Sequence, residues 1–349
     1  MSRRSGRAER WRLACRIHCV TPNPVVDGER KRPRMTHSYK LSRRTARLRA
    51  PVLATIVITL IACNSTDSLT SSSAPTEVGD QTTPAAPAAG EVSLSTTSFA
   101  GGIPMGTANQ PTTAYGSRFN GASRNIYPAY LLGELRDIKA RGGKVILSFA
   151  GNERYYKDAS GHFSFDKWKE RVRRFTSVNF SSYINDGTIV GHYIIDEPND
   201  PTNWNGRPIS PSQVEQMAQY SKQLWPSMAT IARADASYFS TAHYLDAAWA
   251  QYVNRKGSPD DYIRRNVSDA QRRGLALVTG MNILKGGVDG SKMSASQVKS
   301  WGSTLLGSSY PCAFISWEYD DNYLSSSSMK DAMSTLRNKA ENRSSKSCR

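Results

Sequence analysis

The chain has 349 residues, enough for one large domain or two small ones with a sizeable buried core. Its formal net charge of +17 would suit a nucleic-acid-binding protein, but residues 1–62 carry 15 Lys and Arg against 3 Asp and Glu, and the rest of the chain carries 31 against 26. No stripe of basic and aromatic residues follows residue 62, so we expect no nucleic-acid partner.

Residues 1–62 have the features of an export leader. A basic segment, Lys40–Arg49, precedes an apolar run, Pro51–Ala62, that is too short to span a bilayer. Met35 lies at a suitable distance before this run, so residues 1–34 are interpreted as an over-extended start.

The end of this leader resembles the lipobox of bacterial lipoproteins, carried by Leu60-Ile61-Ala62-Cys63. The resemblance implies that Cys63 is lipidated and that the protein is exported and anchored to a membrane, in the periplasm or at the cell surface. An ordinary signal peptide is the alternative, but it predicts an Ala-x-Ala cleavage site that is not evident here.

Residues 63–91 are rich in Ser, Thr, Pro and Ala and contain almost no large apolar side chain. Such a segment cannot bury enough surface to fold, so we interpret it as a disordered tether. A folded domain is expected over residues 92–341, followed by a polar tail over 342–349.

Strand and helix signals alternate through this domain. Apolar runs typical of buried parallel strands cover residues 144–149, 188–195, 228–232, 275–280 and 313–317, and weaker ones cover 99–104, 118–126 and 246–252. Helix starts are indicated at Pro128, Ser164, Ser210, Ser258 and Ser294. No glycine-rich phosphate loop follows the first strand, so the pattern predicts a (β/α)8 TIM barrel.

Active sites of such barrels form where strands end, so charged residues that follow apolar strands are the candidates. One strand ends in Asp196-Glu197-Pro198. Partial burial would raise the pKa of a carboxyl group there toward the working pH, which suits a general acid. Alternatively, Asp196 caps the next turn and Glu197 pairs with an Arg.

The last strand runs into Trp317-Glu318-Tyr319-Asp320, where acids alternate with aromatic residues. Aromatic faces stack on sugar rings and carboxylates bind hydroxyls or transfer protons, so Trp317 and Tyr319 are candidate sugar contacts. Trp317 could equally be a barrel-mouth tryptophan whose N–H is satisfied locally.

Further polar residues complete the candidate substrate contacts. They are Asn152 and Glu153 after the third strand, Tyr193 within the fourth, Asp246 at the sixth and Asn282 at the seventh. Each could instead be an ordinary loop or core residue.

Asp196-Glu197-Pro198 resembles the Asn-Glu-Pro end of the fourth strand in the large clan of barrel glycoside hydrolases, which implies that Glu197 is the acid/base. Lys144–Gly151 and Trp317 are similar to chitinase-like barrels of family 18. Two departures matter: Tyr193 and Ile195 stand where the chitinase pattern has acids, and Asn282 stands where the clan has its second Glu. Glu318 is then the leading second carboxylate, with Asp196, Asp246 and Asp320 as alternatives. Glu318 would follow the seventh strand if the weak second strand were absent.

The sequence therefore predicts a lipid-anchored glycoside hydrolase acting on an external polysaccharide or oligosaccharide, with Glu197, Glu318 and Asp196 as catalytic candidates. The alternatives are a non-catalytic carbohydrate-binding lipoprotein with a degenerate site and a structural lipoprotein without a small ligand. No metal or cofactor motif is found, so none is expected, and we expect a monomer. Export permits a Cys312–Cys348 disulfide, but a buried free thiol at Cys312 is the preferred interpretation.

Overall fold

The computed structural model describes residues 101–116 and 118–349, so the leader, Cys63 and the predicted tether lie outside the described residues. Eight parallel strands close into a barrel in chain order, which confirms the predicted TIM barrel. The strands are β1 Met105–Ala108, β2 Gly121–Arg124, β3 Lys144–Leu147, β4 Ile189–Asp196, β5 Thr230–Arg233, β6 Ala247–Tyr252, β7 Ala276–Met281 and β8 Ala313–Ser316.

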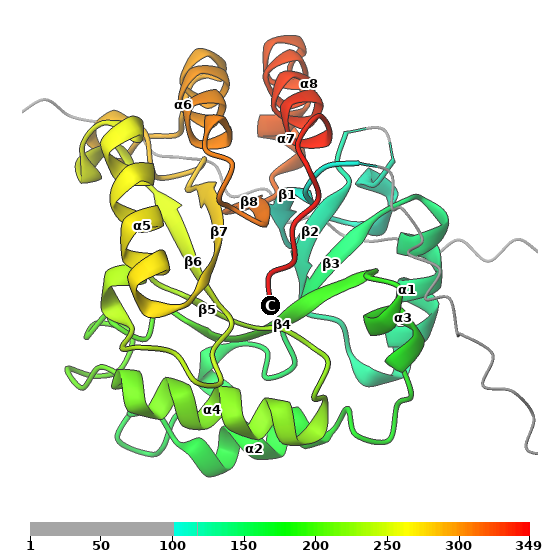
Figure 1. Cartoon of the computed structure of the whole chain (residues 1–349), viewed down its shortest axis with the longest axis vertical. Coiled ribbons are helices and arrows are strands. Elements are labelled where there is room, and N and C mark those ends of the chain that lie inside the picture. The colour runs from blue at the N-terminus through cyan, green and yellow to red at the C-terminus, as the bar shows by residue number, and fades with distance from the viewer. Residues whose placement is uncertain (1–100, 117) are drawn as a thin grey trace, which may run out of the picture. The chain divides into compact units, whose positions relative to one another are not determined.

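Helices surround the ring of strands (Figure 1). They are α1 Leu131–Ala140, α2 Phe165–Arg173, α3 Ser181–Asn185, α4 Pro211–Leu224, α5 Pro259–Arg273, α6 Ala295–Gly307, α7 Asp321–Leu324 and α8 Ser327–Glu341. Short 3-10 turns lie at Thr112–Ala114, Pro128–Tyr130, Glu153–Tyr155, Ala236–Tyr238, Asn254–Lys256 and Val288–Gly290. Among the described helices, none has the length and apolar character needed to cross a bilayer.

Side chains cap four of the five helix starts that the sequence predicts; the fifth, Pro128, opens a 3-10 turn without a side-chain cap, and α1 follows it. Ser210 and Ser294 each form a full capping box with the Gln three residues later, which satisfies backbone N–H groups that the first turn leaves unpaired. Ser164 and Ser258 also accept a backbone hydrogen bond as N-caps. Local hydrogen bonding therefore fixes where these helices begin.

The first strand lies further along the chain than expected. We predicted it at residues 99–104, but β1 begins at Met105, after Pro104, whose nitrogen cannot donate a ladder hydrogen bond. A Cβ atom on Gly106 would lie 1.8 Å from the Gly121 carbonyl oxygen, so close strand contact requires glycine here. Such a short strand of small residues gives little hydrophobic signal.

The weakly marked second strand is real. β2 falls within the expected 118–126 and pairs with both β1 and β3. Glu318 therefore follows the eighth strand, and the alternative numbering that placed it after the seventh is wrong.

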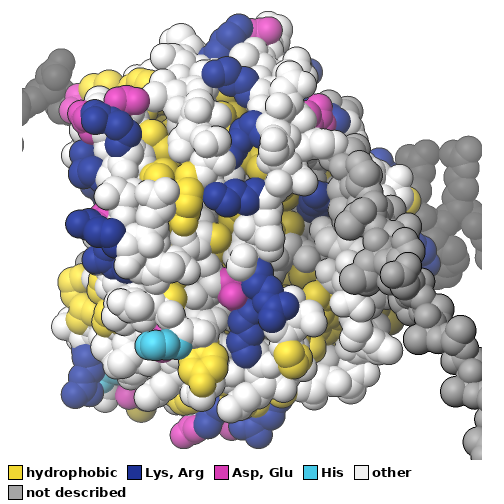
Figure 2. All heavy atoms as spheres, in the orientation of Figure 1, with side chains coloured by type: hydrophobic (Ala, Val, Ile, Leu, Met, Phe, Trp, Pro, Cys, Tyr) yellow, Lys and Arg dark blue, Asp and Glu magenta, His cyan; other side chains and the backbone are white. Residues whose placement is uncertain are grey.

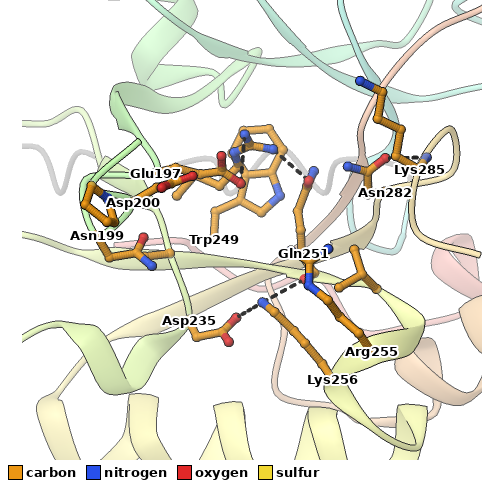
Figure 3. Close-up of a pocket in the computed structure, with 14 residues that line it drawn as sticks. Glu197, Asn199, Asp200, Asp235, Trp249, Gln251, Arg255, Lys256, Asn282 and Lys285 are labelled. Atoms are coloured by element: carbon orange, nitrogen blue, oxygen red, sulfur yellow. Dashed lines mark hydrogen bonds and ion pairs between the residues drawn. The ribbon is translucent and has the colours of Figure 1, made fainter. Parts of the chain in front are cut away.

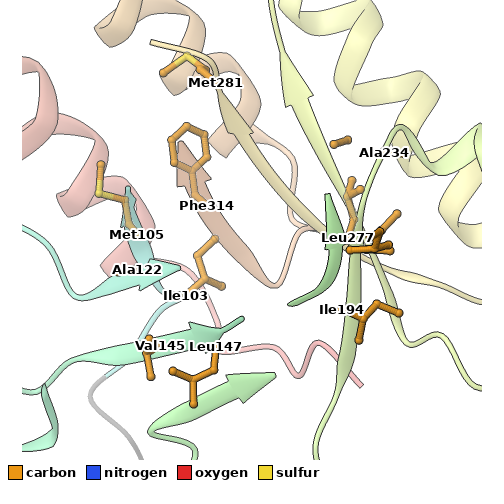
Figure 4. Close-up of a cluster of buried hydrophobic side chains, with 14 of the residues drawn as sticks. Ile103, Met105, Ala122, Val145, Leu147, Ile194, Ala234, Leu277, Met281 and Phe314 are labelled. Atoms are coloured by element: carbon orange, nitrogen blue, oxygen red, sulfur yellow. The ribbon is translucent and has the colours of Figure 1, made fainter. Parts of the chain in front are cut away.

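The core has two layers because successive strand residues point to opposite faces. Inward-pointing side chains fill the barrel, among them Ile146, Tyr193, Trp249, Val278 and Ile315. Outward-pointing ones pack between the strands and the helices, as Figure 4 shows for Val145, Leu147, Leu277 and Phe314.

The C-terminal tail covers the amino end of the barrel. It runs from α8 across the middle of the ring (Figure 1), and a disulfide joins Cys348 to Cys312, which directly precedes β8. The preferred interpretation of Cys312 as a free thiol was therefore wrong: folding the tail back brings two residues 36 positions apart into contact. Figure 2 shows this face, with a broken column of Lys and Arg side chains near its middle.

Candidate functional site

The end of β4 places two carboxylates differently. Asp196 is in register with Arg233 of β5 and accepts a hydrogen bond from its Nε. Glu197 has a left-handed backbone, with φ of 36°, and its side chain is 48% exposed. Positive φ is uncommon for residues other than glycine and concentrates at functional sites. The strand thus ends with Asp196 bound to Arg233 and with Glu197 pointing outward.

Arg233 links the groups around these acids. It is 6% exposed, its Nη1 donates to Gln251 Oε1 at 2.7 Å, and its Nη2 lies 3.4 Å from Glu197 Oε1. Its guanidinium carbon stands 4.8 Å from the centre of the Trp317 ring. Burial disfavours the charged form, but the neighbouring tyrosine and carboxylates outweigh it and raise the pKa of Arg233.

Two cavities open at this carboxyl end of the barrel. The Glu197 cavity, about 540 Å³, is shown in Figure 3 and lies over β4 to β7; besides Glu197 it is lined by Asp200, Arg233, Asp235, Trp249, Gln251, Arg255, Lys256, Asn282 and Lys285. The Tyr193 cavity, about 360 Å³, is lined by residues that include Asn109, Asn152, Glu153, Tyr193, Asp196 and Trp317. Asp196 and Arg233 are hydrogen-bonded to each other but line different cavities: Arg233 lines the Glu197 cavity and Asp196 lines the Tyr193 cavity.

Two groups in the Tyr193 cavity are electrostatically perturbed. Burial, followed by the charge of Asp196, raises the pKa of Glu153, although Lys157 Nζ lies 3.6 Å from its carboxylate. The Tyr193 hydroxyl is also buried, and burial, followed by the charge of Asp196, raises its pKa.

The end of β8 supplies Trp317 and Glu318, which a cis peptide bond joins. Asn109, the residue after β1, donates a hydrogen bond of 2.9 Å from its Nδ2 to Glu318 Oε2 and orients that carboxylate. Trp317 lines the Tyr193 cavity, whereas Glu318 lines neither cavity.

Most of the residues predicted from the sequence gather at this end. Asp196, Trp317, Tyr193, Asn152 and Glu153 line one cavity, and Glu197 and Asn282 line the other.

Two predicted contacts lie elsewhere. Asp246 precedes β6 at the amino end, where Lys222 Nζ lies 2.5 Å and Thr230 N 2.7 Å from its Oδ2. Tyr319 lines neither cavity, and its hydroxyl donates to Asp321. The structure therefore places Asp246 at the opposite end of the barrel, and Tyr319 beside Glu318 but outside both cavities.

Several site residues escaped the sequence analysis. Arg233 directly follows the run at 228–232, so the rule applied to Asp196 and Glu197 would have found it. Trp249 and Gln251 are two positions apart on β6 and both face inward. Because every second residue of a strand faces the same side, this spacing could have identified them. Arg255 and Lys285 lie in loops, and no feature of the sequence indicated that they line a cavity.

No metal cluster is present in the described part of the chain: no three or more His, Cys, Asp or Glu side chains are grouped to hold an ion. The chemistry available here is that of carboxylates, a buried guanidinium, amides and aromatic rings.

No family model matches the sequence, and no curated protein matches it. Solved structures with a similar backbone include a GH18 chitinase from Pseudoalteromonas aurantia, at 10% identity over 68% of this chain and 99% of that one, with a TM-score of 0.44. Saccharomyces cerevisiae Gas2p in complex with laminaripentaose matches at 13% identity over 72% and 68%, with a TM-score of 0.48. A putative alpha-L-fucosidase from Bacteroides thetaiotaomicron matches at 12% identity over 70% and 97%, with a TM-score of 0.45.

Proposed function

We propose that this protein is a glycoside hydrolase in which Glu197 is the general acid/base. The proposal rests on the different positions of the two acids at the end of β4. Asp196 is bound to the buried Arg233, while a left-handed backbone turns Glu197 into a cavity of about 540 Å³. A half-exposed carboxyl group at the mouth of a barrel can reach a glycosidic oxygen and exchange a proton with it.

A second carboxylate is required, and Glu318 after β8 and Glu153 in the Tyr193 cavity are two candidates at this end of the barrel. A nucleophile or base must be ionised, and the raised pKa of Glu153 disfavours that form. Asn109 holds Glu318 in a defined orientation beside Trp317. We therefore assign the second role to Glu318, the binding of sugar hydroxyls to Glu153, and the stacking of a sugar ring to Trp317.

The test is a screen for release of reducing ends from a panel of polysaccharides by the full chain, followed by the Glu197→Gln variant. Loss of a general acid is expected to lower turnover by about 10²–10⁴-fold. The matched control is Glu170→Gln, because Glu170 is an exposed glutamate on α2. Turnover that survives Glu197→Gln would refute the assignment of Glu197.

A non-catalytic carbohydrate-binding protein is the second candidate. It is favoured by Asn282, because the loop after β7 offers an amide where a second carboxylate is expected. Titration calorimetry separates the two functions: this candidate predicts that glycans bind, that no product forms, and that Glu197→Gln leaves binding unchanged.

We also propose that the protein is anchored to a membrane through a lipid on Cys63. The support is the sequence Leu60-Ile61-Ala62-Cys63. Metabolic labelling with an alkyne fatty acid should mark the wild-type protein and leave Cys63→Ser unmarked. Equal labelling of both proteins would rule out this anchor.

A further inference from the structure

The Glu197 cavity contains a buried donor with a fixed direction. Gln251 is 9% exposed, and its Oε1 accepts a hydrogen bond from Arg233. Because an arginine cannot accept a hydrogen bond, this contact settles which end of the amide faces Arg233. The Gln251 Nε2 group is left buried, without a partner among the described residues, in the wall of the cavity. A ligand oxygen would remove the penalty of this unpaired donor.

Positive charge is concentrated on one side of the same cavity. Figure 3 shows Glu197 and Asp200 on one side and Arg255 and Lys285 on the other. Arg255 follows β6 and Lys285 follows β7, and neither side chain forms an ion pair or hydrogen bond with any described residue.

The other two cations of the cavity are already neutralised. Arg233 contacts the carboxylates of Asp196 and Glu197, and Lys256 lies 2.8 Å from Asp235. The uncompensated charge at the β6–β7 wall is therefore that of Arg255 and Lys285, which line the same cavity as Gln251.

We propose that the Glu197 cavity is a subsite for a uronic acid, whose carboxylate is bound by Gln251, Arg255 and Lys285. This inference rests on the proposed function, because it places the sugar next to Glu197. A negative group at the β6–β7 wall pairs with the two free cations and accepts a hydrogen bond from Gln251 Nε2. The opposite wall then faces Glu197, so the glycosidic bond lies on the acidic side. The substrate class is accordingly a glycan that contains uronic acid residues.

The test is binding by titration calorimetry, with the full-length Glu197→Gln variant so that no ligand is consumed. The probes are tetrasaccharides of galacturonate, glucuronate and mannuronate, each compared with its own methyl ester, which keeps the ring and removes the charge. We expect at least one acid to bind tenfold or more tightly than its ester, and the ratio to shrink as salt is raised.

The double variant Arg255→Gln/Lys285→Gln should bring the ratio of acid to ester affinity close to one. Its matched control is Arg141→Gln/Lys330→Gln, which removes two exposed cations outside both cavities and should keep the wild-type ratio. Gln251→Met should weaken binding of the acid more than binding of the ester.

Three results would overturn the inference: equal affinities for every acid and its ester, a preference that survives the double variant, or tighter binding of a sulfated tetrasaccharide than of any uronate. If the proposed hydrolase function is wrong, a different result is expected. In that case the acid binds selectively and the wild-type chain releases no product from it or from any other glycan. If neutral glycans are hydrolysed while acids and esters bind equally, the hydrolase stands and the uronate subsite does not.

Discussion

The two ends of this barrel differ in how they treat several polar groups, although Arg343 Nη1 at the amino end is also buried without a described partner. At the amino end, Asp246 is bound by Lys222 and Thr230, and a disulfide fixes the tail across the opening. At the carboxyl end, the Gln251 Nε2 group is buried in a cavity wall without a partner among the described residues. Paired groups stabilise the fold, and an unpaired donor beside a cavity is available to a ligand, which supports the proposed site at the carboxyl end.

Each end also has a largely buried ion pair, and the two pairs differ in their surroundings. Lys222 and Asp246 are 15% exposed at the side chain, and Lys222 also donates to a backbone carbonyl. Arg233 is 7% exposed at the side chain and additionally contacts Gln251 and Trp317. The first pair is expected to serve stability alone, and the second to serve both stability and the site.

The largest expected effect comes from removing the cation of each pair. Arg233→Met leaves the Asp196 carboxylate without its partner and should lower the free energy of unfolding by about 3–5 kcal/mol. It should also abolish glycan binding. Lys222→Met should cost about 1–3 kcal/mol, because Thr230 still donates to Asp246, and should leave glycan binding intact. Urea unfolding of the full chain measures the change in stability, and calorimetry measures glycan binding. Equal effects of the two variants on binding would contradict the difference expected between the two ion pairs.

Loss of the disulfide should give the next largest effect. Cys348→Ser opens a link between residues 36 positions apart and should lower the free energy of unfolding by about 2–4 kcal/mol. Because the bond lies at the amino end, turnover and glycan affinity of the folded variant should not change. Thermal unfolding with and without reductant provides the control, since reduced wild type should match the variant. A loss of turnover at temperatures where the variant is folded would contradict a purely stabilising role.

The last prediction concerns a buried unpaired group away from both cavities, and its effect on stability is confined to acidic pH. His192 Nε2 is buried without a described partner, but His192 lines neither cavity, and its Nδ1 contacts Ser221 Oγ at 2.8 Å. Burial lowers the pKa of His192 to about 3. Below pH 6.5 the unfolded chain therefore binds a proton that the folded chain does not.

The contribution of His192 to stability is fully present above pH 6.5 and is lost as the pH falls toward 3, by about 1.4 kcal/mol per pH unit. The difference in unfolding free energy between wild type and His192→Gln, measured from pH 4 to pH 8, isolates this slope. A flat difference would show that His192 is protonated in the folded protein, and altered glycan binding would place it in the site.

The fold was largely predictable because strong hydrophobic periodicity and capping serines mark its elements. β3, β4 and β7 are apolar runs, and the Ser210 and Ser294 capping boxes formed as expected. The first strand was predicted at the wrong residues because close contact with β2 requires Gly106 and favours small neighbours. Such residues give no hydrophobic pattern.

The site was predictable in part. Strand-end position indicated Asp196, Glu197 and Trp317, which line the two cavities, whereas Asp246, also a candidate, precedes β6 at the opposite end. Gln251 was missed because its importance comes from the contact with Arg233, a residue 18 positions away whose proximity depends on strand register. A hydrogen bond of this kind can be identified only from the tertiary structure.

The most direct test of the central claim is a crystal structure of Glu197→Gln bound to the oligosaccharide that it binds most tightly. The account predicts a sugar ring stacked on Trp317, with the glycosidic oxygen within hydrogen-bonding distance of the substituted side chain at position 197. Ligand bound at the amino end, or at the carboxyl end with position 197 facing away from every glycosidic oxygen, would contradict it.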